Sequence, residues 1–257
     1  MSLESSLRAT RDAGQKLLVP YVTAGLDDQW LDVVRALAAA GANAIELGIP
    51  FSDPVMDGPT IQLSSQRALA RGVTPAGLIT EATKLDVDVP IAVMTYVNLV
   101  GHMGYRRFAA ALEDAGIEGA ILPDLPLDEL APWAEAADAH AVATVLLAAP
   151  VTTDDRLRAI CERSRGFLYG VSLMGVTGER DALATQASEM GRRAKAMTDL
   201  PVLLGVGISN AEQAVEAAQY ADGVVVGSAL VSRLLAGGGP DAAFEFVSEL
   251  RAALDAA

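Results

Sequence analysis

The sequence has few of the residues from which many catalytic and structural sites are built. Its 257 residues include one cysteine, Cys161, and two histidines, His102 and His140. A single cysteine excludes a disulfide within the chain, which fits a reducing compartment, so we expect a cytoplasmic protein. Two isolated histidines argue against a histidine-based triad or a zinc site, so we expect no metal. Acid–base chemistry must then come from carboxylates or tyrosines.

Basic residues and long apolar runs are also scarce. The chain has 19 Lys and Arg residues against 33 Asp and Glu, for a net charge of −14, and it has no basic run. Nucleic acid and anionic membranes are therefore not expected as partners. No stretch reaches the roughly 18 apolar residues of a membrane span. The polar residues 1–16 lack the apolar core of a signal peptide.

Short apolar runs alternate with alanine-rich amphipathic stretches along the whole chain. Eight such β-then-α units without a polar linker predict an α/β fold, a (β/α)8 TIM barrel forming a single domain over residues 1–257. A doubly wound sheet is the alternative, although it usually has fewer units. Strands are predicted at 17–22, 44–49, 91–96, 119–123, 143–148, 167–172, 201–206 and 223–227.

The two longest intervals between strand starts follow the second and the sixth strands. Extra length after a barrel strand lies at the C-terminal face, where barrel active sites are built. We therefore predict active-site loops at 50–72 and 173–186. The second contains the letters GVTGER, which are typical of a mobile lid. A tolerated surface insertion is the alternative for both.

Glu46 interrupts the apolar run of the second strand. Strand alternation places it on the same face as Ala44 and Gly48, toward the barrel interior, where these small neighbours leave room for a ligand. Burial raises a carboxyl pKa, which suits a group that donates and accepts a proton near neutral pH. A structural ion pair is the alternative, but no predicted strand contains a lysine or an arginine.

Asp57 and Tyr169 are further candidates. Asp57 lies in the turn that follows the strand of Glu46, and its place beside Gly58 and Pro59 is equally compatible with an ordinary turn role. Tyr169 is centred in the sixth predicted strand, in a sequence with only 5% aromatic residues. Core packing is an equally good explanation for this tyrosine.

Glycines at the ends of the last two strands indicate a phosphate site. Gly207 follows the seventh strand, and Gly227 and Ser228 follow the eighth. Barrels often bind phosphate between these two loops, with help from a helix N-terminus. No lysine or arginine is adjacent, so backbone N–H groups would bind the anion. Tight strand-to-helix turns alone are the alternative. Ser209 is predicted to cap the helix after the seventh strand.

Seven segments together resemble the tryptophan synthase alpha chain family over essentially the whole sequence. The most specific reads IELGIPFSDPVMDGPTIQ, at 45–62. The others are PYVTAGL, MTYVN, LPDLP, FLYGVSLMGVTG, GVGIS and ADGVVVGSALV, at 20–26, 94–98, 122–126, 167–178, 205–209 and 221–231.

This resemblance implies a lyase of tryptophan biosynthesis that cleaves indole-3-glycerol phosphate by a retro-aldol reaction, without a cofactor. Glu46 would be the acid–base group at indole C3, and Asp57 would act on the indole N–H. The implied substrate-binding residues are Tyr169 near the glycerol group, Gly178, Gly207, Gly227 and Ser228 at the phosphate, and Tyr21, Tyr96 and Leu122 or its neighbours around the indole.

The resemblance also implies a partner, a pyridoxal-phosphate-dependent beta subunit in an α2β2 complex. Loop 50–60, with its apolar Pro54, Val55 and Met56, would face that subunit; local packing under the loop is the alternative. Val206 and the pair Leu173–Met174 depart from the usual family pattern. The rival functions are another phosphate-binding barrel, such as a sugar-phosphate isomerase or epimerase, and a barrel that mainly activates a beta partner.

Overall fold

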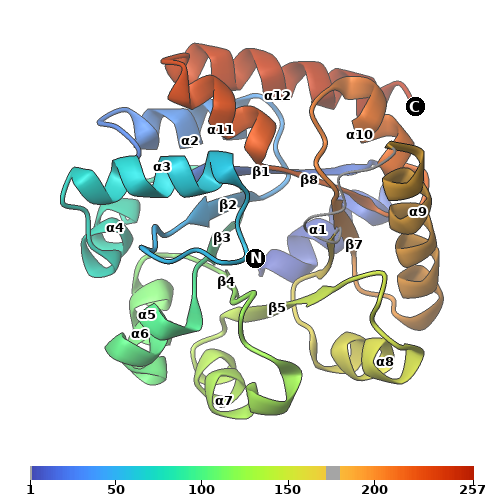
Figure 1. The fold of residues 1–257 in the computed structure, drawn as a ribbon, viewed down its shortest axis with the longest axis horizontal. Coiled ribbons are helices and arrows are strands. Elements are labelled where there is room, and N and C mark those ends of the chain that lie inside the picture. Colours follow the sequence, from blue (N-terminus) through green and yellow to red (C-terminus); the bar gives the residue numbers. More distant parts are fainter. Residues whose placement is uncertain (1, 172–179) are drawn as a thin grey trace.

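The computed structural model describes residues 2–171 and 180–257. Eight parallel strands close into a barrel in sequence order, from β1 beside β2 round to β8 beside β1 (Figure 1). The predicted TIM barrel and all eight predicted strands are confirmed. The strands are β1 Leu17–Thr23, β2 Ile45–Gly48, β3 Ile91–Met94, β4 Gly119–Ile121, β5 Ala143–Ala148, β6 Leu168–Val171, β7 Val202–Gly205 and β8 Gly223–Val226.

Helices surround the barrel, and several strand-to-strand connections hold two of them (Figure 1). The helices are α1 Leu3–Asp12, α2 Trp30–Ala39, α3 Pro59–Ala70, α4 Pro75–Ala82, α5 Val97–Met103, α6 Tyr105–Asp114, α7 Ala131–Ala139, α8 Asp154–Arg163, α9 Arg180–Met197, α10 Ala211–Ala218, α11 Ser228–Leu235 and α12 Gly239–Asp255, with a short 3-10 helix, η1, at Leu127–Glu129.

The expected loop 50–72 is wrong in its second half. Residues 50–58 and 71–72 lie outside helices, whereas α3 occupies Pro59–Ala70, with Gly58 as its N-cap. Proline at the first helical position is favourable, since its missing N–H would have no intrahelical partner there. The second expected loop, 173–186, overlaps the start of α9; Leu173, Met174 and Gly178 lie outside the described residues.

Strand register assigns the two faces of β2 as the sequence predicted. Glu46 pairs with Tyr21 on β1 and with Ala92 on β3. Ala92 belongs to the apolar cluster inside the barrel, whereas Ile45 and Leu47 pack in the larger cluster between the barrel and its helices. Glu46 therefore occupies an interior position among these strands.

The N-terminal end of the barrel is filled by α1. Leu3 and Leu7 are fully buried and belong to the interior cluster that includes Leu17 and Phe167. Figure 1 shows α1 inside the ring of outer helices, near the barrel strands. The polar N-terminal segment thus forms a helix whose apolar side closes one end of the barrel, which leaves the opposite end for a site.

Candidate functional site

Glu46 is the most unusual charged residue of the described structure. Its side chain lies inside the barrel and is only 1% exposed. Neither carboxylate oxygen has a hydrogen-bond partner among the described residues. Burial, and then the negative charge of Asp57, raise the pKa of Glu46 to about 8. A carboxyl group in these surroundings is protonated at neutral pH and can donate a proton to a bound molecule.

Two tyrosines lie beside two strand glycines at the C-terminal end of the barrel. A Cβ atom on Gly48 would lie 1.9 Å from the Tyr21 hydroxyl, and one on Gly205 would lie 2.5 Å from the Tyr169 ring. Both tyrosines are buried, and burial is the main reason that their pKa values are raised, so the hydroxyls stay protonated. This corrects our expectation for Gly48, because Tyr21, rather than a ligand, occupies the space that the glycine leaves.

Asp57 is held in place by Tyr96. The Tyr96 hydroxyl donates to Asp57 Oδ2 at 3.0 Å and accepts the backbone N–H of Met56 at 2.9 Å. The Tyr96 ring also stacks on Phe51, with 5.0 Å between ring centroids. Burial raises the pKa of the Asp57 carboxyl, and the hydrogen bond from Tyr96 offsets only part of this rise. From the sequence, Tyr96 was expected only to shape the indole pocket, and its contact with Asp57 was not predicted.

The two acids influence each other through charge. The Asp57 charge contributes to the raised pKa of Glu46. Since Asp57 has a hydroxyl donor and Glu46 has no partner among the described residues, Glu46 is the one that keeps a proton at neutral pH. The site therefore combines a carboxyl group that keeps its proton at neutral pH with a second one that accepts a hydrogen bond favouring its ionised form, a pairing that suits acid–base chemistry at two points of one substrate.

The predicted phosphate-binding residues lie at the ends of neighbouring strands. Gly207 follows β7 with φ +75°, a conformation that favours glycine, and its Cβ position is open. Gly227 is the N-cap of α11, and Ser228 is its first residue. The expected cap of α10 was displaced by one residue, because the Asn210 side chain, not that of Ser209, accepts the Gln213 N–H.

Of the indole-pocket candidates, Leu122 is not in the barrel interior. Leu122 packs in the outer cluster, between the strands and the helices, and its neighbour Ile121 belongs to the interior cluster. Alternation along the chain explains the difference, since adjacent residues of a strand face opposite sides. Ile121 is therefore the better candidate for a pocket wall.

Comparisons with known proteins agree with this architecture. The family model described as "Tryptophan synthase alpha chain" matches residues 7–251. The chain belongs to this family. The tryptophan synthase alpha chain of Streptomyces coelicolor is 44% identical over 256 residues, covering 98% of this chain and 94% of that one. The alpha chain of Methanosarcina mazei is 46% identical, covering 86% and 82% of the two chains.

Solved structures lead to the same family. A structure of tryptophan synthase from Mycobacterium tuberculosis superposes with a TM-score of 0.90 at 38% identity, covering 98% of this chain and 97% of that chain. Tryptophan synthase subunit alpha from Legionella pneumophila has a TM-score of 0.90 at 31% identity, with both chains fully covered. The resemblance stated from sequence, to an enzyme family of tryptophan biosynthesis that cleaves indole-3-glycerol phosphate, is confirmed.

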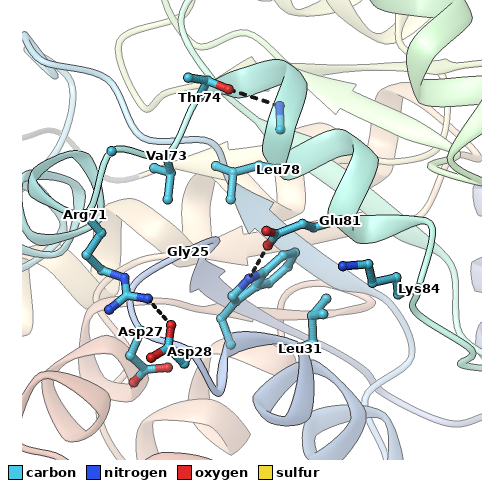
Figure 2. A pocket seen from close by; sticks show the side chains of 13 residues that line it. Gly25, Asp27, Asp28, Leu31, Arg71, Val73, Thr74, Leu78, Glu81 and Lys84 are labelled. Carbon is cyan, nitrogen blue, oxygen red and sulfur yellow. Dashed lines mark hydrogen bonds and ion pairs between the residues drawn. The ribbon is translucent and has the colours of Figure 1, made fainter.

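A cavity of about 460 Å³ lies on the flank of this tryptophan synthase alpha chain fold, between α2, the end of α3 and α4 (Figure 2). Two contacts bridge its walls: Arg71 pairs with Asp28, and the Trp30 indole N–H donates to Glu81 at 3.1 Å. These pairs hold α3 and α4 against the start of α2. Because its polar groups largely bind one another, we assign the cavity a structural role.

The surroundings of Cys161 and His140 indicate structural roles. Cys161 is buried in an apolar cluster with Leu157 and Ile160, and burial raises the pKa of its thiol. His140 ends α7 and lies 2.7 Å from a Glu113 carboxylate oxygen.

Within residues 2–171 and 180–257, no group of three metal-ligating side chains is present, and no helix is long and apolar enough to cross a membrane.

Proposed function

We propose that this chain is a lyase that cleaves indole-3-glycerol phosphate into indole and glyceraldehyde 3-phosphate by an aldolase-type reaction, with Glu46 and Asp57 as the catalytic residues. The observation that carries the assignment is the Glu46 carboxyl group, buried inside the barrel without a partner among the described residues. Burying an unpaired polar group costs free energy, which a purely structural role would leave unexplained.

Glu46 would move protons on both sides of the bond that breaks. Its protonated carboxyl first donates a proton to indole C3, which removes the aromaticity of the ring. The resulting carboxylate then accepts the proton of the C3′ hydroxyl. The C3–C3′ electron pair returns to the ring as the aldehyde forms, so Glu46 ends the cycle protonated. A pKa of about 8 suits a group that must do both at neutral pH.

Asp57 would act at the other end of the conjugated ring. Protonation at C3 places positive charge on the indole nitrogen, and a nearby carboxylate stabilises that charge or accepts the N–H proton. The hydrogen bond from Tyr96 supports this role, because it favours the ionised form of Asp57. Two carboxyl groups in different protonation states therefore match the two ends of the reaction.

The remaining contacts to substrate are proposed as the sequence predicted them. Tyr21, Tyr96 and Tyr169 would surround the indole and glycerol groups. Tyr21 and Tyr96 lie near the carboxyl ends of β1 and β3, and the Tyr169 ring lies beside Gly205 at the end of β7. The phosphate would bind the backbone at Gly207, Gly227 and Ser228, helped by the N-terminus of α11. Gly178 is proposed as a further phosphate contact and lies outside the described residues.

We also propose a pyridoxal-phosphate-dependent beta subunit as partner, in a cytoplasmic α2β2 complex. Val55 is 77% exposed and Met56 is 44% exposed in loop 50–58, so apolar surface is available next to Asp57. Exposed apolar side chains of this kind are typical of a protein interface. The exposure of Val55 argues against the alternative of local packing under the loop.

Indole release by the purified chain from indole-3-glycerol phosphate tests the proposal, first alone and then with a beta subunit added. We expect weak cleavage alone and strong cleavage in the complex. Glu46→Gln should reduce cleavage by on the order of 10³-fold while the circular dichroism spectrum stays unchanged, because the amide cannot cycle a proton. Near-normal turnover by a folded Glu46→Gln protein would refute the role of Glu46.

A further inference from the structure

The position of Tyr96 depends on a carboxylate from another connection of the barrel. Asp124 follows β4, and its Oδ1 accepts the backbone N–H of Val97 at 2.9 Å. Val97 is the first residue of α5, whose N-cap is Tyr96. The first N–H groups of a helix have no partner within the helix, and the side chain of Tyr96 does not supply one here. Asp124 therefore caps α5 from outside.

That cap fixes the peptide group between Tyr96 and Val97. The same peptide group anchors the Tyr96 side chain, which reaches loop 50–58 by three contacts: stacking on Phe51, the N–H of Met56 and the carboxylate of Asp57. The Tyr96 side chain is 4% exposed. A shift of its backbone would therefore move its hydroxyl relative to Asp57. The hydrogen bond between them would then be lost or weakened, because hydrogen bonds weaken steeply when their geometry changes.

From this chain of contacts we infer that Asp124 is a positioning residue for the reaction, acting through Val97 N–H and Tyr96 on Asp57. The inference rests on the proposed function only in the role given to Asp57. It links the connection after β4 to the loop after β2, which are far apart in the sequence. It also explains why a carboxylate lies beside the start of a seven-residue helix.

The charged and titratable groups around Asp57 define what should change. Asp57 has the Tyr96 hydroxyl as its donor, and its charge acts on Glu46, Tyr21 and Tyr169. The hydrogen bond from Tyr96 lowers the pKa of Asp57 against the effect of burial. Loss of the Asp124 cap should weaken that bond and raise the pKa of Asp57.

The test compares Asp124→Ala with Asp124→Asn, whose amide oxygen can still accept the Val97 N–H. The pKa of Asp57 is measured by ¹³C NMR of the substrate-free protein, with Asp57→Asn to assign the signal. We expect a higher pKa in Asp124→Ala and a value close to wild type in Asp124→Asn. Turnover of Asp124→Ala at neutral pH should fall roughly tenfold, since a misplacement of about 1 Å can cost on the order of a hundredfold.

Asp128 provides the matched control on the same connection. It lies in η1 and pairs with Arg156 at 3.0 Å on the surface, so Asp128→Ala should leave the Asp57 signal unchanged. Asp124→Ala should also have no further effect in a Tyr96→Phe background, because both changes act through one contact. If Asp124→Ala does not fold, Asp124→Glu, which displaces the acceptor by one methylene, takes its place.

An unchanged Asp57 pKa in a folded Asp124→Ala protein would overturn the inference, and so would an effect that adds fully to that of Tyr96→Phe. The NMR measurement needs no turnover, so its outcome is independent of the reaction. Failure of the proposed function would instead appear as absence of indole release from the wild-type protein.

Discussion

Glu46 and Asp222 are two buried acids of one barrel with opposite surroundings. Asp222 lies just before β8, where its Oδ1 accepts from Lys195 Nζ at 2.7 Å and its Oδ2 accepts the Val202 N–H at 2.8 Å. Glu46 lies within β2, and neither of its oxygens has a partner in the described ranges. A partnered acid contributes to stability, whereas an unpartnered one lowers it. The difference separates a structural role from a chemical one.

The same contrast holds for the two ends of the barrel. At the N-terminal end, α1 fills the interior with Leu3 and Leu7, and both are fully buried. At the C-terminal end, the strands carry Tyr21 and Tyr169 beside glycines, in place of aliphatic side chains. One set of strands thus supports a packed end and a reactive end, which is the usual division in barrel enzymes.

Replacing each of these two carboxylates by an amide should give the largest effects. One replacement should lower stability and the other should lower turnover. Asp222→Asn should keep turnover but lower the free energy of unfolding by about 2 kcal/mol, because one of its two contacts loses its acceptor. Glu46→Gln should lose turnover without lowering the free energy of unfolding. Chemical denaturation and indole release, measured on both variants, check the exchange. Loss of turnover in a fully folded Asp222→Asn protein would contradict this division.

The pH dependence of stability should report the protonation state of Glu46. Burial raises the pKa of Glu46 from 4.5 to about 8, so the folded state binds a proton that the unfolded state releases. The contribution of Glu46 is therefore fully present below about pH 4.5 and is lost as the pH rises through about 8. Glu46→Gln removes this loss, so the free energy of unfolding of the variant relative to wild type should increase by on the order of 3–4 kcal/mol between about pH 5 and about pH 8.

Denaturation midpoints at several pH values measure this effect. Glu118 is a matched control, since its carboxyl pKa is also raised by burial while it lies just before β4. Glu118→Gln should change the pH dependence less, because Glu118 is only partly buried. A stability difference between wild type and Glu46→Gln that does not change with pH would mean that Glu46 is ionised in the folded protein.

The sequence was sufficient to predict the barrel because strand signals are local. Each apolar run of β-branched and aliphatic residues formed one strand. The alternation of side chains along β2 assigned Glu46 to the barrel interior. The start of α3 was also signalled locally, by Gly58 followed by Pro59, but we interpreted that pair as part of a turn. The start of α3 could therefore have been predicted, because its signal is present in the sequence.

Contacts between distant segments could not be predicted in this way. Tyr96 and Asp57 are 39 positions apart, and no periodicity relates them. Tyr21 and Gly48 lie on neighbouring strands. Strand alternation predicts only the face on which a side chain lies, and not the direction in which its ring leans. The sequence therefore predicted the principal residues of the site. It did not predict the contacts between them that set their protonation states.

Adding one methyl group at Gly48 gives the smallest expected effect and the most local test of the reactive end. The new Cβ of Gly48→Ala would lie 1.9 Å from the Tyr21 hydroxyl, so either the ring or the strand must shift. We expect turnover to fall about tenfold with the fold retained, since small displacements near reacting groups are costly. Gly58→Ala is the matched control, because no atom lies within 4 Å of its Cβ position. Equal activity of the two variants in the indole assay would mean that Tyr21 does not shape the site.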